Sequence, residues 1–213
     1  MQIRLQNIVP AYLEKEKVEN SQVWEKEFVI KKGEKIQIVA PSGSGKTSLM
    51  HIIYGIRRDY TGNLFYENNN INNFDIEKFS AYRQNKISIV FQDLRLFPTQ
   101  TVRENLVIKK QLDPFPGAVD ITDMARRLGI ENKLDRLART CSYGEQQRVA
   151  IIRSLQQPFD ILLLDEPFSH LDDKNRSLAM NLMLEEAEKR NAAIVYADLK
   201  STEYFTPDKL YLL

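Results

Sequence analysis

The segment APSGSGKTS, residues 40–48, combines glycines, a lysine and hydroxyl side chains in an order suited to hold phosphate. Gly43 and Gly45 leave room for backbone N–H groups to converge on phosphate oxygens. Lys46 adds a positive charge for the β- and γ-phosphates, and the hydroxyl of Thr47 is a ligand for Mg²⁺. The residues expected to bind the nucleotide here are Ser42, Gly43, Ser44, Gly45, Lys46, Thr47 and Ser48.

The residues on either side support this interpretation. The strand pattern EKIQIVA precedes the segment and the helix pattern TSLMHIIYG follows it, which is the context that a phosphate-binding P-loop needs. The strict pattern has Gly where Ala40 stands, and Ala fits if the backbone φ there is negative. The alternative is a Gly-Ser turn that happens to precede a lysine, and the strand and helix argue against it.

A second chemical signal is ILLLDEP, residues 161–167, an apolar strand that ends in two acids. Asp165 is expected at the carboxyl edge of the sheet beside the P-loop, where it can orient Mg²⁺. Glu166 is the candidate general base that polarises an attacking water. Taken alone, the segment is equally well a strand followed by a charged turn at Pro167, and the upstream P-loop favours catalysis.

The elements that must position these residues alternate between strands and helices. Strands that are apolar throughout, separated by helices, predict a parallel sheet covered on both faces. Residues 94–140 have helical spacing and are interpreted as a small inserted helical lobe, with DPFPG at 113–117 as a breaker. The asparagines within 62–75 predict a surface turn. The run LEEAEKR at 184–190 predicts a solvated helix face with i, i+4 ion pairs. The predicted strands are residues 3–9, 24–30, 34–40, 86–91, 160–166 and 192–197, and the predicted helices are 47–55, 102–112, 121–130, 146–157 and 175–190.

The composition indicates a soluble globular protein, with 43% hydrophobic and 28% charged residues. The formal net charge of +1 gives no argument for a nucleic-acid partner, and none is expected. The sequence shows neither a secretory signal nor an apolar run long enough to span a bilayer. A single cysteine excludes an internal disulfide, which suits a reducing cytosol.

The order of motifs resembles that of the ATP-binding cassette (ABC) ATPases. The P-loop is followed by FQD at 91–93, CSYGEQQR at 141–148, LLLDEP and SHLD at 169–172. The resemblance covers essentially the whole chain and implies an α/β fold. That fold has a RecA-like P-loop NTPase core with a mainly parallel sheet, an antiparallel β lobe and an inserted helical lobe. It divides the single domain 1–213 into a core with the β lobe, 1–93 and 141–213, and a helical lobe, 94–140.

The resemblance also implies the remaining site residues, in a dimer that binds two ATP molecules head to tail. Gln92 contacts Mg²⁺ and the attacking water, so the metal set is Thr47, Gln92 and Asp165. The expected catalytic residues are Glu166, Gln92 and Lys46. Asp172 belongs to the loop that links the two sites. Tyr12 stands near the position of an aromatic that stacks on adenine, and the nearby Trp24 and Phe28 are assigned to core or surface packing.

The segment CSYGEQQR corresponds to the family's signature loop, commonly LSGGQ, which reaches the γ-phosphate held by the opposite subunit. Ser142 and Gly144 match that pattern, and Ser142 also suits a helix N-cap. Tyr143 replaces a glycine and would be strained by about 1–3 kcal/mol if a positive φ is needed there. Glu145 replaces a glutamine, and its carboxylate would be costly near ATP unless it points at the ribose or at solvent.

A further departure lies at the end of the strand AAIVYA, where the family has a switch histidine and this chain has Ala197. Loss of one such electrostatic partner costs on the order of 10²–10³ in rate in other enzymes. The only histidines are His51, interpreted as a structural residue, and His170, interpreted as an ordinary loop variant with a substitute switch role as the alternative. Ala197 and Tyr143 therefore predict slow turnover.

The segment FQDLRLFPTQTVRENL, residues 91–106, resembles the subgroup of lipoprotein-release, macrolide-export and cell-division ATPases. Leu94, Leu96 and Phe97 are expected to line a groove for a membrane subunit, with simple packing as the alternative. The function implied is an ATP-binding and hydrolysing subunit, peripheral on the cytoplasmic face of the cell membrane. Its partners would be a second ABC ATPase subunit and integral membrane subunits. The alternative is a regulatory cassette, or one degenerate half of a heterodimer, with little hydrolysis.

Overall fold

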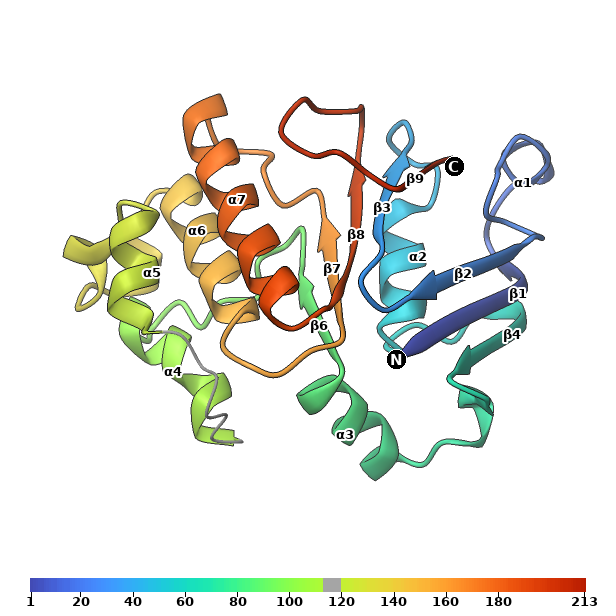
Figure 1. Ribbon diagram of the computed structural model, residues 1–213, viewed down its shortest axis with the longest axis horizontal. Helices are drawn as coiled ribbons and strands as arrows, with labels where there is room; N and C mark the ends of the chain where they lie inside the picture. The colour runs from blue at the N-terminus through green and yellow to red at the C-terminus, as the bar shows by residue number, and fades with distance from the viewer. Residues whose placement is uncertain (113–119) are drawn as a thin grey trace.

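The computed structural model describes residues 1–112 and 120–213, and its centre is a five-stranded parallel sheet in the order β6-β7-β8-β3-β9 (Figure 1). Strands β6, β7 and β8 are largely apolar and buried, as expected for a sheet covered on both faces. The predicted breaker at 113–117 lies outside the described residues. The strands are β3 (Lys35–Val39), β6 (Ile87–Val90), β7 (Ile161–Asp165), β8 (Ala193–Asp198) and β9 (Lys209–Leu212).

A four-stranded antiparallel sheet packs beside this core in the order β2-β1-β4-β5. Its strands are β1 (Gln2–Pro10), β2 (Glu27–Lys31), β4 (Tyr60–Tyr66) and β5 (Asn69–Asn70). β1 pairs with β2 and β4, with an irregularity between Gln6 and Val9. The surface turn expected from the asparagines is confined to residues 67–68 and includes only Asn68 of them, because Asn69 and Asn70 form β5; neither β4 nor β5 was predicted.

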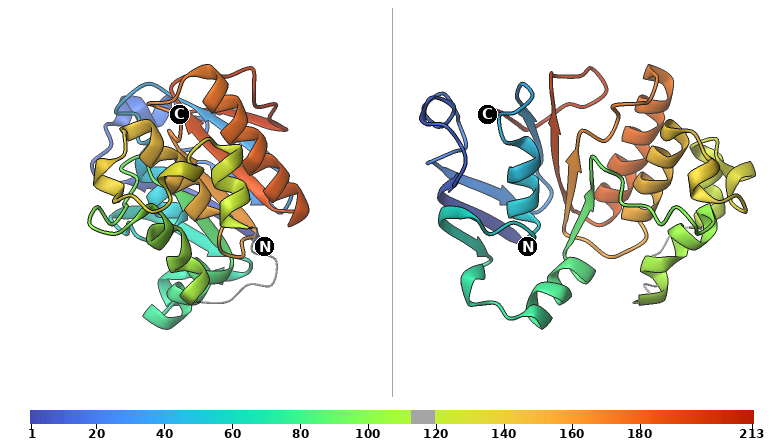
Figure 2. Two further views of the ribbon diagram at one scale, coloured as in Figure 1. Left: turned by 90° about the vertical axis from the view of Figure 1, so that its left-hand side faces the viewer. Right: turned by 180° about the vertical axis from the view of Figure 1, so that it is seen from behind.

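Helices cover the two faces of the parallel sheet differently. α2 (Lys46–Ile53) lies between the two sheets, and α6 (Tyr143–Ser154) and α7 (Asp173–Lys189) lie on the opposite face (Figures 1 and 2). Each face of the sheet has its own hydrophobic core, and alternate residues of β7 pack into one or the other. Leu163 packs on the α2 side and Leu162 on the α6 side. The predicted doubly covered α/β core is therefore confirmed.

The segment expected to be a helical lobe contains α4 (Val102–Leu112) and α5 (Ile121–Arg127), at the end of the molecule away from the antiparallel sheet (Figure 1). Short 3₁₀ turns follow at Glu131–Lys133 and Ala138–Thr140. α4 and α5 both pack on α6, so the signature segment stands between the helical region and the core. None of the described helices combines the length and apolar character needed to cross a membrane.

Besides β4 and β5, three further elements were not predicted: α1 (Lys15–Glu19), α3 (Ile76–Asn85) and β9. α3 buries only Phe79 fully, so its sequence carries little helical periodicity. It is capped at Asp75, whose carboxylate accepts from the Lys78 N–H at 2.7 Å. β9 alternates half-buried and exposed residues at the edge of the sheet, next to β3.

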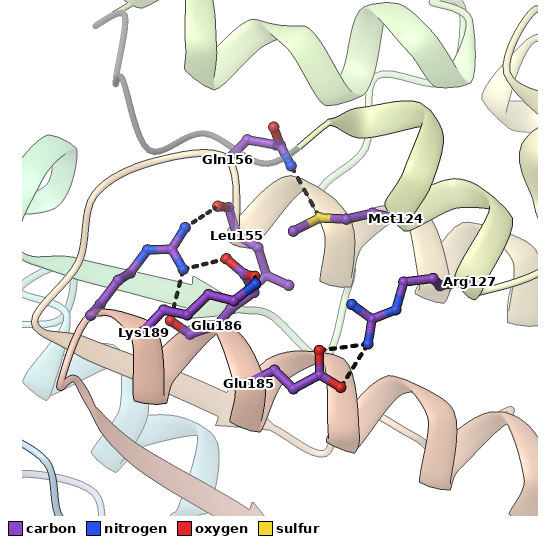
Figure 3. A network of polar contacts seen from close by, with 8 residues as sticks. Met124, Arg127, Leu155, Gln156, Glu185, Glu186 and Lys189 are labelled. Atoms are coloured by element: carbon purple, nitrogen blue, oxygen red, sulfur yellow. Dashed lines mark hydrogen bonds and ion pairs between the residues drawn. The ribbon is translucent and has the colours of Figure 1, made fainter.

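The prediction of a solvated face for residues 184–190 is wrong at Glu186, which is fully buried. Its carboxylate accepts from Lys189 at 2.7 Å and from Arg190 (Figure 3). The expected i, i+4 ion pair therefore exists, with an i, i+3 pair beside it, but its carboxylate lies in the core. The neighbouring Glu185 pairs with Arg127 of α5 at 2.7 Å, which joins α5 to α7.

We expect Glu186→Gln to lower the free energy of unfolding by about 1–3 kcal/mol, because a buried cationic partner loses its charge-assisted hydrogen bond. Urea unfolding at pH 7 measures the change. The matched control is Glu188→Gln on the exposed side of the same helix, expected within about 0.5 kcal/mol of the parent. Equal stability of the two variants would contradict the importance of this buried pair.

Candidate functional site

The loop between β3 and α2 has the backbone that its glycines were expected to permit. Gly43 has φ 77° and Gly45, the N-cap of α2, has φ 102°. Side chains rarely adopt such angles, so glycine is required at both positions. Ala40 is buried and has no positive φ, so the departure from the strict pattern costs no backbone strain.

Lys46 is buried inside this loop and already contacts the expected general base. Its Nζ donates to the carbonyl oxygens of Ala40 at 2.7 Å and Pro41 at 2.9 Å, and lies 3.2 Å from Oε1 of Glu166. Glu166 has φ 44°, and its backbone N–H donates to the carbonyl of Ala197 at 3.0 Å. The structure thus joins two predicted catalytic residues from distant segments.

The three predicted metal ligands also meet. Oγ1 of Thr47 lies 3.2 Å from Oε1 of Gln92 and 3.3 Å from Oδ1 of Asp165. Asp165 is fully buried, its Oδ2 has no hydrogen-bond partner, and burial raises its pKa to about 6. A hydroxyl, an amide oxygen and a carboxylate with one unpaired oxygen are oxygen ligands of the kind that Mg²⁺ prefers, so these residues fit that ion.

We expect Asp165→Asn to stabilise the nucleotide-free chain by about 1 kcal/mol at pH 7, because it removes a buried negative charge whose Oδ2 has no donor. A folded pKa raised above that of the unfolded chain lowers native stability between the two pKa values, because the unfolded chain has lost a proton that the native carboxyl still holds. The advantage of Asn should therefore be small near pH 4, grow up to about pH 6, and level off once the native carboxyl has ionised. Unfolding with EDTA at several pH values measures it, and a parent more stable at pH 7 would contradict it.

Tyr12 lies beside the first turn of α2. Its hydroxyl is 2.6 Å from Oγ of Ser48, and the guanidinium of Arg57 lies 4.6 Å from its ring centroid. Arg57 also donates to Oγ of Ser48 at 2.7 Å. Tyr12 is 51% exposed, so the aromatic residue expected near adenine lies at the P-loop and is accessible.

The signature segment begins helix α6, and this removes the reason to expect backbone strain at Tyr143. Ser142 is the N-cap of α6 and forms a capping box with Glu145. Tyr143 is therefore the first helical residue and has no positive φ, so the expected strain is absent. Its ring packs on His170 at 4.1 Å, and its hydroxyl reaches the carbonyl of Gln92 at 3.5 Å.

The carboxylate of Glu145 is bound within its own chain. Its carboxylate accepts from the Ser142 N–H at 2.8 Å and pairs with Lys133 at 3.0 Å. Burial raises its pKa, but these hydrogen bonds outweigh burial and the pKa is lowered. Gly144 is needed for close packing, since a Cβ there would lie 2.9 Å from the carbonyl oxygen of His170.

Asp172 caps α7 by accepting from the Asn175 N–H at 2.8 Å. Within the described part of the chain, no hydrogen bond or ion pair joins Ser142, Gly144 or Asp172 to residues 40–48. The structure therefore does not bring these three residues to the P-loop of the same chain, and their contact with nucleotide stays a prediction.

Ala197 is fully buried at the end of β8 and lies in register with Asp165 of β7. Its side chain therefore stands on the face of the sheet that carries the predicted metal ligand. His170 packs on Tyr143 and Ser169 instead, and His51 packs on Phe91.

One residue at the loop was assigned only to packing. The indole Nε1 of Trp24 donates to the carbonyl of Ser44 at 3.3 Å, so Trp24 is in direct contact with the P-loop. The one signal for Trp24 in the sequence was its position in the predicted strand 24–30, which directly precedes the strand that leads to the P-loop.

Comparison with known proteins agrees with this geometry. The profile of the family described as ABC transporter matches residues 25–169, from the segment before β2 to the loop after β7. The chain is an ABC transporter ATPase domain. The lipoprotein-releasing system ATP-binding protein LolD of Rickettsia typhi is 34% identical over 184 residues, which cover 85% of this chain and 81% of that protein.

Other relatives of this ABC ATPase include much longer chains. The macrolide export ATP-binding/permease protein MacB of Nitrosomonas europaea is 34% identical over 169 residues, and the match spans only 26% of its length. A solved ATP-binding cassette, a dimer in a post-hydrolysis state bound to ADP and Pi, has a TM-score of 0.76 at 26% identity. It covers 93% of this chain, and 88% of that chain is matched. The expected resemblance to lipoprotein-release and macrolide-export cassettes is confirmed.

Proposed function

We propose that this ABC ATPase domain binds and hydrolyses MgATP, and that the observation carrying this is the contact between Lys46 and Glu166 beside Thr47, Gln92 and Asp165. When nucleotide binds, the ammonium group of Lys46 would leave Glu166 and pair with a phosphate oxygen instead. Glu166, released from the lysine, would then polarise the attacking water. Thr47, Gln92 and Asp165 would hold Mg²⁺, which neutralises charge on the phosphates. Tyr12 would lie beside the base.

The same proposal includes a head-to-tail dimer. Ser142 stands at the N-terminus of α6, where backbone N–H groups and the helix dipole favour an anion. Gly144 lets that helix end pack on the loop of Asp172, so both segments would approach a partner's nucleotide together. The chain would form a single domain with residues 94–140 as its helical lobe.

A membrane subunit would dock in the groove between the core and α4. A cavity of about 270 Å³ there is lined by Phe91, Phe97, Arg95, Lys109 and other side chains. Burial, together with the nearby charges of Arg153 and Arg83, lowers the pKa of Lys109 to about 8. Phe97 is exposed, whereas Leu94 is buried and packs in the core, so of the expected lining residues Phe97 fits best. Such docking would place the chain on the cytoplasmic face of the membrane.

The finer prediction is slow turnover. Tyr143 is unstrained, so backbone strain at the signature segment does not weaken the site; slow turnover is expected from Ala197, which replaces the switch histidine. The alternative, a regulatory cassette with little hydrolysis, needs no general base, whereas this chain keeps Glu166 within 3.2 Å of Lys46.

Phosphate release by the purified chain tests the proposal, with Mg²⁺ and with EDTA, over a range of chain concentrations. Metal-dependent hydrolysis that rises per subunit with concentration supports an active dimer. Nucleotide binding without release at any concentration would favour the regulatory alternative, and no binding would refute both.

A further inference from the structure

Trp24, the only tryptophan in the chain, lies directly behind the phosphate-binding loop. Its side chain is 0% exposed. The indole Nε1 donates to the carbonyl of Ser44 at 3.3 Å. A Cβ on Gly45 would lie 3.0 Å from the indole ring, so the ring occupies the space behind that residue. The loop therefore rests on Trp24 through a hydrogen bond and through packing.

Trp24 is itself held on the sheet that carries the loop. Oγ of Ser21 accepts from the backbone N–H of Trp24 at 2.9 Å. Gln22 and Leu212 exchange hydrogen bonds, both at 2.8 Å, which tie this segment to β9. β9 pairs with β3, and β3 leads into the loop. The indole is thus fixed relative to the strand from which the loop starts.

The carbonyl that Trp24 binds is part of a rigid peptide group that also carries the N–H of Gly45. The carbonyl of Ser44 and the N–H of Gly45 belong to the same planar peptide and point in opposite directions. A donor that holds the carbonyl therefore also sets the direction of the N–H. None of the backbone hydrogen bonds of the described residues uses the Gly45 N–H as donor, so it is free for an anion.

We propose that Trp24 is a positioning residue that fixes the Ser44–Gly45 peptide so that the Gly45 N–H faces the phosphates of bound nucleotide. This inference rests on the proposed function, because it concerns the same nucleotide site. The carbonyl behind the loop would otherwise be buried without a donor, and the peptide could rotate away from the binding orientation.

The test compares Trp24→Phe, which keeps an aromatic ring but loses the N–H, with Phe28→Leu as matched control. Phe28 is buried in the same core and packs on Tyr211, away from the loop. We expect Trp24→Phe to raise the dissociation constant for MgADP by about three- to tenfold, the worth of one hydrogen bond. KM for ATP should rise by a similar factor with kcat within about twofold, because the lost contact serves ground and transition states alike.

Phe28→Leu should lower the unfolding midpoint and leave MgADP affinity at the parental value. Trp24→Phe that binds MgADP like the parent would overturn the inference and leave the proposed function intact. A parent chain that binds no MgADP would refute the proposed function itself.

Two further measurements cover the case in which Trp24→Phe fails to fold. Replacement of Trp24 by benzothienylalanine keeps the bicyclic shape but lacks the N–H donor, and is expected to weaken MgADP binding to the same extent. In the parent, emission from the single tryptophan should change when MgADP binds. A benzothienyl variant with parental affinity, or emission that MgADP leaves unaltered, would overturn the inference.

Discussion

Replacement of Glu166 by Gln is expected to slow MgATP hydrolysis by about 10²–10⁴-fold, the usual contribution of a general base. The amide retains the shape of the side chain and can still accept a hydrogen bond from Lys46, which lies 3.2 Å from the carboxylate. It cannot accept a proton from water. Loss of the negative charge should at the same time free Lys46 for phosphate, so nucleotide affinity is expected to equal or exceed that of the parent.

Single-turnover phosphate release and MgADP titration separate the two effects. Glu188→Gln on the exposed face of α7 is the matched control, because it removes the same charge far from any predicted site residue. It should hydrolyse ATP at the parental rate. If Glu166→Gln and the parent hydrolyse at equal rates, Glu166 is not the base, and residual hydrolysis comes from another group.

The convergence of Thr47, Gln92 and Asp165 could be predicted, although they lie far apart in the sequence. Each belongs to a segment at the carboxyl edge of a parallel strand, and such edges form one crevice. The pattern of apolar strands and the motif order together determine this edge, so the fold class and the core of the candidate site follow from the sequence.

The remaining features depend on contacts that no local pattern encodes. The contact of Trp24 with Ser44 requires the docking of a segment outside the motif onto the loop. The contacts of the Glu145 carboxylate are with the capping box and with Lys133, twelve positions earlier in the sequence. The strain expected at Tyr143 was wrong because the helix begins there, one residue after its cap at Ser142. Helix α3 was missed because it buries only Phe79 fully.

Ala197→His is expected to raise the hydrolytic rate by about 10²-fold, the lower end of what one preorganised electrostatic partner supplies. Ala197 pairs in register with Asp165, and its carbonyl accepts from the N–H of Glu166 at 3.0 Å. An imidazole at this position would therefore stand next to the predicted metal ligand and the predicted base. It must enter a fully buried position, so we also expect a loss of about 1–3 kcal/mol in unfolding free energy.

Two further variants separate the effect of the imidazole from other effects. Ala197→Leu adds bulk without a hydrogen-bonding group, and the double variant Ala197→His with Glu166→Gln tests whether the gain in rate depends on Glu166. The leucine variant should lose stability without gaining rate, and the double variant should be as slow as Glu166→Gln alone. A rate gain in Ala197→His that requires Glu166 means that the chain has a complete base and lacks only a charge partner. If folded Ala197→His is no faster than the parent, the missing histidine does not limit turnover. The slow step would then lie in dimer closure or in the membrane partner, which the signature segment and the groove beside Phe97 would control.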